Sequence, residues 1–256
     1  MNLLLVHGNG GANARFQLFT AKAEAQNAPY TIHLPKLPGF EGRPLPETGE
    51  PWSWFLEALA EAVEGVAGEW VYYGHGIGGS ILLEWAKRGW RNQAGEAFVP
   101  KEVILHGIIG ASLQYRFFPK LMKPKLMRNL IHYLISAPFL QQRWEKKLFL
   151  YPERIPADLR QQFFADYKRC AAFPVFFDLI TPAWYSEVQA AIGNQPFHFL
   201  WGSRERVIAS KFLAYWKNDF PNARFTIIEG WDHFPMLEQV DEFYTELTTL
   251  IETTTT

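Results

Sequence analysis

The sequence contains a single cysteine, Cys170, among its 256 residues. One cysteine excludes an intramolecular disulfide and any site that binds a metal through several thiolates, and it fits a reducing compartment. An excess of either charge is also missing, because 25 Lys and Arg stand against 26 Asp and Glu, a net charge of −1. This balance lacks the overall electrostatic signature of a nucleic-acid-binding protein. We therefore expect no nucleic-acid partner, no metal site and no cofactor.

Long apolar runs are missing as well. The first run covers only residues 3–6 and has no basic flank, so it is not typical of a signal peptide. No stretch approaches the roughly 20 apolar residues that span a bilayer. With 48% hydrophobic and 20% charged residues, the composition is that of a folded globular chain. These features predict a soluble, cytoplasmic protein.

Short strand-like runs alternate with helical patterns near both ends of the chain. The expected strands are 3–6, 30–34, 70–73, 102–105, 197–201 and 224–228, and the expected helices are 52–66, 79–90, 210–219 and 238–251. Such alternation indicates an α/β fold with a mostly parallel sheet of about six strands flanked by helices. The last four threonines predict a frayed end.

The alternation stops between residues 111 and 190. Seven prolines divide this stretch into short helices; they are Pro119, Pro124, Pro138, Pro152, Pro156, Pro174 and Pro182. The stretch holds 12 Lys and Arg and 6 Asp and Glu, whereas the rest of the chain holds 13 and 20. We therefore predict a core formed by residues 1–110 and 191–256, interrupted by a helical insertion at 111–190.

Basic and apolar residues are interleaved in the first part of this insertion. They are Lys120, Lys123, Lys125 and Arg128 with Leu121, Met122, Leu126 and Met127. The simpler interpretation is a solvated helical cap over a pocket. The same mixture also suits contact with an anionic membrane surface or an acidic partner.

A glycine-rich turn follows the predicted strand 70–73. The sequence there is WVYYGHGIGGSILLEW, in which an apolar strand meets a helix through residues 74–79. This is the context of the nucleophile elbow, G-x-S-x-G, whose middle residue projects into an active site. The middle residue here is Gly76.

Five segments in the same order resemble the α/β-hydrolase family. They are the "HG" loop His7-Gly8-Asn9-Gly10-Gly11, the loop Leu37-Pro38-Gly39-Phe40-Glu41-Gly42, the elbow, the segment Trp201-Gly202-Ser203-Arg204-Glu205, and the histidine loop Gly230-Trp231-Asp232-His233-Phe234-Pro235. The resemblance covers nearly the whole chain. Strand 3–6 corresponds to the family's third strand, so its first two are missing. The resemblance implies a capped hydrolase with a nucleophile, an acid and a histidine in that order.

The resemblance assigns His233 as the catalytic base and Glu205 as its acid. It also places the backbone N–H groups of Asn9 and Ile77 in an oxyanion hole. Glu205 either orients His233 or forms a salt bridge with Arg204 or Arg206.

Gly76 stands where the family has Ser, Cys or Asp, so covalent catalysis by this residue is impossible. Ser80 lies about one helical turn too far along, and Ser112 follows the next strand and could approach the pocket. A φ above zero in this turn would favour glycine.

The remaining residues of these loops are expected to be structural. His7 and His75 form parts of their turns, and Asp232 is expected to point outward. We expect an α/β-hydrolase with altered or disabled catalysis, related to esterases that act on small apolar esters or carbonyl compounds. The alternative is a non-catalytic relative whose pocket under the cap binds a small apolar molecule, or whose surface binds a partner.

Overall fold

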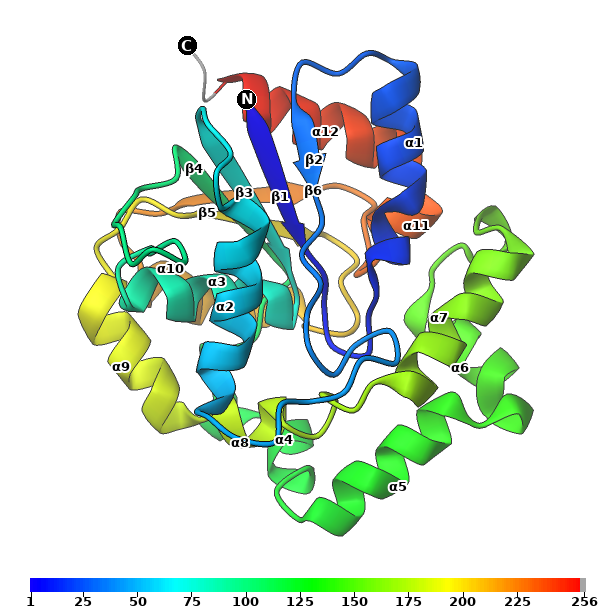
Figure 1. Ribbon diagram of the computed structural model, residues 1–256. Helices are drawn as coiled ribbons and strands as arrows, with labels where there is room; N and C mark the ends of the chain where they lie inside the picture. Colours follow the sequence, from blue (N-terminus) through cyan, green and yellow to red (C-terminus); the bar gives the residue numbers. More distant parts are fainter. Residues whose placement is uncertain (254–256) are drawn as a thin grey trace.

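The computed structural model describes residues 1–253; residues 254–256, in the threonine run expected to fray, lie outside this part. Six strands form one parallel sheet in the order β2-β1-β3-β4-β5-β6 (Figure 1). The strands are β1 (Asn2–Val6), β2 (Thr31–His33), β3 (Trp70–His75), β4 (Glu102–His106), β5 (His198–Gly202) and β6 (Arg224–Ile228). The predicted six-stranded α/β sheet is confirmed.

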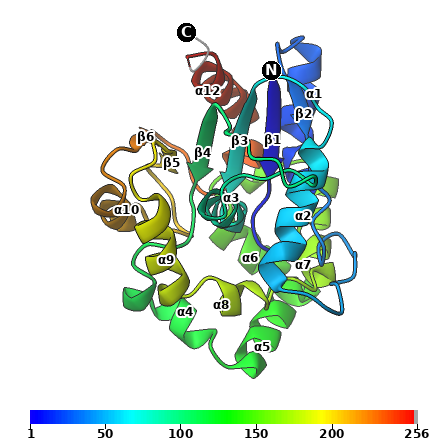
Figure 2. The same cartoon turned by 60° about the vertical axis from the view of Figure 1, so that its left-hand side comes forward.

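Helices cover both faces of this sheet. One face carries α2 (Pro51–Val63), α3 (Ile77–Lys87), α9 (Pro182–Ile192) and α10 (Leu213–Asp219). The other carries α1 (Gln17–Ala25) and α12 (Val240–Thr253), with the short α11 (Pro235–Glu238) before it. Figures 1 and 2 show these two helical layers.

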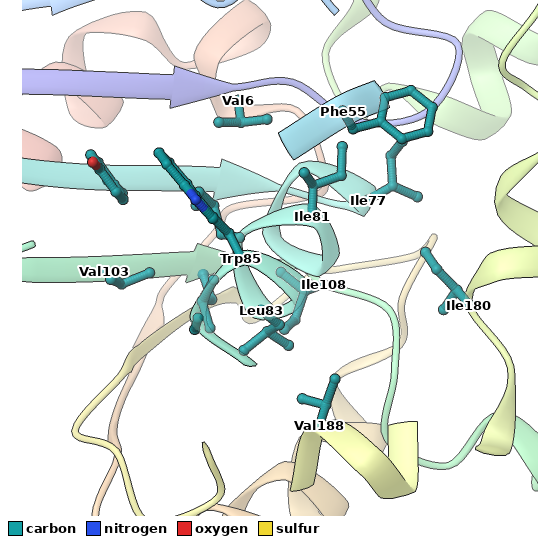
Figure 3. Close-up of a cluster of buried hydrophobic side chains, with 14 of the residues drawn as sticks. Val6, Phe55, Ile77, Ile81, Leu83, Trp85, Val103, Ile108, Ile180 and Val188 are labelled. Atoms are coloured by element: carbon teal, nitrogen blue, oxygen red, sulfur yellow. The ribbon is translucent and has the colours of Figure 1, made fainter. Parts of the chain in front are cut away.

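The alternation of side chains along each strand explains the two layers. In β1, Leu4 and Val6 join the cluster under α2 and α3, whereas Leu3 and Leu5 join the cluster under α1 and α12. All four side chains are fully buried. Successive residues of a strand point to opposite faces, so a strand buried on both sides reads as a continuous apolar run. Figure 3 shows part of the first cluster, in which Val6 and Phe55 lie near Ile77 and Ile81.

The stretch between β4 and β5 is helical, as expected. Its α-helices are α4 (Phe117–Leu121), α5 (Lys125–Ser136), α6 (Gln141–Leu148), α7 (Ala157–Arg169), α8 (Phe176–Leu179) and α9. The helices α4 to α8 lie beyond the carboxyl ends of the strands (Figure 2). In contrast, α9 packs against α3, where the Trp184 indole N–H donates to Glu84 over 2.8 Å.

The helix boundaries differ from the expected ones in several places, most of them by two or three residues. The helix α1 was not expected, and the expected helix 238–251 corresponds to α12, which begins at Val240 after the separate short helix α11. The helix α3 begins two residues earlier than predicted, directly after Gly76. Within residues 1–253, no helix combines the length and apolar content that crossing a lipid bilayer requires.

Candidate active site

The candidate site lies at the carboxyl ends of β1 and β3, which are neighbours in the sheet. From β1 the chain passes to β2 on one side, and then returns to β3 on the other. Loops at such a reversal diverge and leave a crevice, which is where ligands bind in open α/β sheets. The "HG" loop after β1 and the glycine turn after β3 lie on either side of this position, and a Cβ atom on Gly76 would lie 3.5 Å from the Gly8 Cα.

Three glycines of the β3–α3 turn are required by close packing. A Cβ atom on Gly78 would lie 2.3 Å from the carbonyl oxygen of Val6, and one on Gly74 would lie 2.6 Å from the backbone of Gly79. A Cβ on Gly79 would lie 2.2 Å from the Ile108 side chain. These contacts are shorter than van der Waals distance, so strand and helix approach this closely because side chains are missing.

Gly76 is different, because a side chain would fit there. A Cβ placed on Gly76 lies 3.5 Å from the Gly8 Cα and 4.0 Å from His233 Nε2, which are ordinary contact distances. What favours glycine is the backbone, with φ +55° and ψ −122°. This conformation costs a non-glycine residue about 1–3 kcal/mol. The turn therefore has the expected positive φ and directs its middle position at His233.

His233 and Glu205 form a buried pair. The Nδ1–H of His233 donates to Glu205 Oε2 over 2.8 Å, and both residues are about 5% exposed. Glu205 Oε1 accepts the backbone N–H groups of Val207 and Ile208 over 2.7 and 2.8 Å. Burial opposes ionisation of Glu205, but His233 and these amide donors outweigh it, so the pKa of Glu205 is lowered. The carboxylate fixes the tautomer of His233 and leaves Nε2 as the basic nitrogen, which faces Gly76.

A glycine that the sequence did not single out allows this pair to form. Gly107 follows β4 with φ +54°, and a Cβ there would lie 3.2 Å from both Glu205 Oε2 and His233 Nδ1. A side chain at this position would press on the pair. Gly107 matters because the end of β4 packs against the loops that carry Glu205 and His233. The spacing of residues in the sequence does not reveal this contact.

Asp232 does not point outward, contrary to expectation. It is fully buried, and it accepts both the Arg206 side chain over 2.5 Å and the Arg206 backbone N–H over 2.9 Å. The arginine charge compensates the buried carboxylate. This ion pair joins the histidine loop to the loop after β5, and it occupies Arg206, one of the two arginines considered as alternative partners for Glu205.

Three further histidines, His7, His75 and His106, are buried and held neutral. Burial is the main cause that lowers the pKa of His7 to about 4 and that of His106 to about 3. Burial, followed by the charges of its neighbours, keeps the pKa of His75 well below its usual range. His75 Nε2 donates to the carbonyl of His233 over 2.8 Å. His7 Nδ1 contacts the carbonyl of Gly8 over 3.1 Å within its own loop, whereas His75 joins the end of β3 to the histidine loop, so both rings make structural contacts.

Neither serine considered as a substitute nucleophile contacts His233. The Ser80 hydroxyl donates to the carbonyl of Ile109 over 2.7 Å, which makes it a structural contact between α3 and the chain after β4. Ser112 is buried with φ +65°, and its Oγ has no hydrogen-bond partner in residues 1–253. Burial raises the pKa of the Cys170 thiol to about 12, so this thiol is unreactive at neutral pH.

The predicted oxyanion loop is held by a residue that the sequence did not reveal. Arg15 is 4% exposed, donates to the carbonyl of Asn9 over 3.3 Å, and lies over the rings of Phe163 and Phe234 at 4.6 and 5.2 Å. The Asn9 side chain also donates to the carbonyl of Phe173, in the insertion, over 3.2 Å. Ile77 opens α3, so its N–H belongs to the first helical turn, whose N–H groups have no intrahelical acceptor.

The site is closed in this structure. The ring of Tyr167, from α7, fills the space beside Gly10, where a Cβ would lie 2.2 Å from it. A groove of about 680 Å³ lies elsewhere, between Val63 and Lys101 at the amino end of β3. Within residues 1–253, no group of three or more His, Cys, Asp or Glu side chains is arranged to hold a metal ion.

The sequence profile of the Alpha/beta hydrolase family matches residues 3–246. No curated protein sequence matches the chain significantly.

Several solved structures share the fold. A thermophilic esterase from Thermogutta terrifontis is 17% identical, with 100% of this chain and 91% of that chain covered and a TM-score of 0.72. A bromoperoxidase from Bacillus anthracis is 14% identical, with 98% and 91% covered and a TM-score of 0.73. The 2-hydroxy-6-oxo-6-phenylhexa-2,4-dienoate hydrolase from Rhodococcus sp. strain RHA1 is 18% identical, with 98% and 90% covered and a TM-score of 0.72.

Proposed function

The chain belongs to the alpha/beta hydrolase family, and from that premise we propose that it has the base, acid and oxyanion donors of a carboxylic-ester hydrolase, with glycine at the nucleophile position. The substrate class is a small apolar ester or carbonyl compound. Catalysis is then altered, because no covalent acyl-enzyme intermediate can form on Gly76.

The observation that carries this proposal is the direction of the Gly76 position. A Cβ there lies 4.0 Å from the nitrogen of His233 that Glu205 leaves unprotonated. One further bond to a hydroxyl oxygen would bring a nucleophile within the hydrogen-bond distance of about 2.6–3.2 Å that a nucleophile and its base need. The other glycines of the turn have no such space.

Without that hydroxyl, a water molecule takes the place of the nucleophile. His233 Nε2 accepts a proton from water while the water oxygen bonds to the ester carbonyl carbon. The N–H groups of Asn9 and Ile77 stabilise the resulting oxyanion. Collapse of this intermediate breaks the bond to the alcohol oxygen, which takes the proton from His233, and the acid and the alcohol are released. Glu205 keeps the imidazole oriented and stabilises its cationic form.

The insertion serves this function as a cap. Tyr167 lies against Gly10, and Phe173 accepts a hydrogen bond from Asn9, so residues 111–190 contact the oxyanion loop directly. Since His233 is nearly inaccessible, a substrate enters when these helices move away. The lone buried cysteine supports a reducing, cytoplasmic setting.

A second candidate function is binding without catalysis. Gly76 favours it, because glycine relieves the backbone strain of the turn while removing the nucleophile. The closed site also favours it, because His233 is buried away from solvent. In that case the space under the cap holds a small apolar ligand, and the pair of His233 and Glu205 serves the stability of the loops.

Turnover of aryl esters of graded acyl length by the parent chain and by His233→Ala distinguishes the two functions. Water attack predicts slow hydrolysis by the parent and a drop of about tenfold or more in His233→Ala. Ser80→Ala is the matched control, since its hydroxyl contacts only the fold, and it should hydrolyse like the parent. Equal rates for the parent, His233→Ala and buffer would reject catalysis and favour the binding function.

A further inference from the structure

The outer surface of the insertion exposes an unusual number of large apolar side chains. Eleven such side chains are exposed within residues 1–253, and seven of them lie between residues 115 and 139. They are Tyr115, Phe117, Phe118, Leu126, Leu130, Tyr133 and Phe139. Single exposed apolar residues are normal, but a contiguous group marks an interaction surface. We call these seven residues the apolar patch.

The helix α5 shows that this exposure is built into the fold. Leu126, Leu130 and Tyr133 follow one another at spacings of four and three, so they share one helical face, and that face is exposed. The opposite face carries Arg128, which is 4% exposed. The inward face is also apolar, because Ile131 and Ile135 pack against the core cluster. A surface helix normally has one apolar face, whereas α5 has a second one that is exposed.

Arg128 fixes the orientation of α5. Its guanidinium donates to both carboxylate oxygens of Asp178 over 2.5 and 2.7 Å, and to the carbonyls of Met122, Lys123 and Pro174. A bidentate pair with three further acceptors fixes the rotation of the helix about its axis. Leu126, at 78% exposed, and Tyr133, at 62%, therefore point outward because α5 is held in that orientation.

Strong positive charge borders the apolar patch. Residues 111–150 hold eight Lys and Arg and one Asp or Glu, a net charge of +7 in a chain whose total is −1. Lys120, Lys123 and Lys125 are exposed beside the patch. Within residues 1–253, the ion pairs of the insertion use Arg128, Arg160, Arg169 and Glu187, and none of them includes these three lysines.

From this combination we propose that the apolar patch and its lysines dock the protein on an anionic phospholipid bilayer. Apolar side chains enter the boundary between headgroups and acyl chains, while lysines keep their ammonium groups among anionic headgroups. A second copy of the chain fits poorly, because face-to-face pairing would bring two segments of net charge +7 together. Docking does not depend on the residue at position 76.

The position of the patch relates it to the candidate site. The helices α4 and α5 lie at the end of the molecule toward which the strands run (Figure 2). Gly76 directly follows β3, at that same end of the sheet. Docking through this end turns the carboxyl ends of the strands, where the candidate site lies, toward the bilayer.

Co-sedimentation of the full chain with vesicles tests the proposal. We expect binding to phosphatidylcholine vesicles that contain phosphatidylserine, weaker binding to pure phosphatidylcholine, and further weakening at high salt, because salt screens the attraction. Leu126→Ser/Leu130→Ser should weaken binding by about tenfold or more, and so should Lys120→Glu/Lys123→Glu.

Matched controls separate the patch from general effects. Val99→Ser/Ile227→Ser removes two exposed apolar side chains outside the patch, and Lys36→Glu/Arg91→Glu makes the same change in net charge elsewhere. Both should bind like the parent. Failure of the parent to bind anionic vesicles at low salt would overturn the proposal. So would a patch-dependent dimer, or a patch-dependent complex with an acidic protein, without vesicle binding.

Discussion

The two halves of the candidate site are built in different ways. The half that comes from the loops after β5 and β6 is dense with polar contacts, because Glu205 accepts three hydrogen bonds and Asp232 pairs with Arg206. The half that comes from the β3–α3 turn is nearly bare backbone, in which glycine is required at three positions by packing and at Gly76 only by φ. Loss of a nucleophile therefore disturbs little, whereas loss of the acid or the base would disturb the fold. His233 and Glu205 therefore contribute to the fold independently of the catalytic role that we propose for them.

The largest expected effect contrasts two glycines of the turn. Gly78→Ala places a Cβ 2.3 Å from the Val6 carbonyl, where backbone cannot yield, and should lower the free energy of unfolding by about 4 kcal/mol or more. Gly76→Ala meets no clash and should cost about 1–3 kcal/mol through φ alone. Urea unfolding measures both.

Gly65→Ala is the control for the backbone effect, since Gly65 has φ +69° and open space around its Cβ position. It should cost no more than Gly76→Ala. If Gly76→Ala and Gly78→Ala were equally destabilising, Gly76 would be a packing glycine like its neighbours, and the contrast would be wrong.

The next effect concerns the loss of stability at acidic pH. The folded pKa values of His7 and His106, about 4 and 3, lie below the usual value near 6.5 of an unfolded chain, and that of His75 is lowered too. The unfolded state therefore binds more protons below pH 6.5, so stability is complete above that pH and falls as the pH drops toward 4. Between pH 7 and 5.5 each histidine should cost about 1 kcal/mol. A free energy of unfolding that stays constant over this interval would show that these rings accept protons while folded.

A smaller effect is expected for the acid of the pair. The folded pKa of Glu205 is lowered, so its charge stabilises the fold above the unfolded pKa near 4.5, and this contribution is lost as the pH falls through the folded value. Glu205→Gln should cost about 1–3 kcal/mol at pH 7. At a pH low enough to protonate Glu205 in the folded parent, the difference between parent and variant should shrink. A difference that persists there would mean that shape rather than charge explains the effect.

Much of the fold follows from local pattern. The run at residues 3–6 predicted β1 because a strand buried on both faces is apolar throughout, and the glycines before α3 predicted the sharp turn. The helix α1 was not predicted. Phe16, Phe19 and Ala23 are buried at helical spacing, but the glycine-rich loop before them gives no clear start to the helical pattern of apolar residues.

The residues of the site that escaped prediction depend on distant contacts. Arg15 lies beneath rings from α7, and Gly107 matters because two loops more than 90 residues further along the chain converge on it. Asp232 was expected outside because acids usually are; its burial depends on Arg206, 26 residues away. Pairings of this kind are decided by the assembled fold, and no local pattern encodes them.

The most direct test of the central claim is labelling of Gly76→Ser with a serine-directed fluorophosphonate, alongside the parent chain and Gly76→Ser/His233→Ala. If the nucleophile is the missing part, the single variant is labelled and hydrolyses aryl esters faster than the parent, while the parent and the double variant remain unlabelled. A folded Gly76→Ser that neither reacts with the fluorophosphonate nor hydrolyses the esters would contradict the claim, because His233 and Glu205 would then be unable to activate a serine hydroxyl within reach of His233 Nε2.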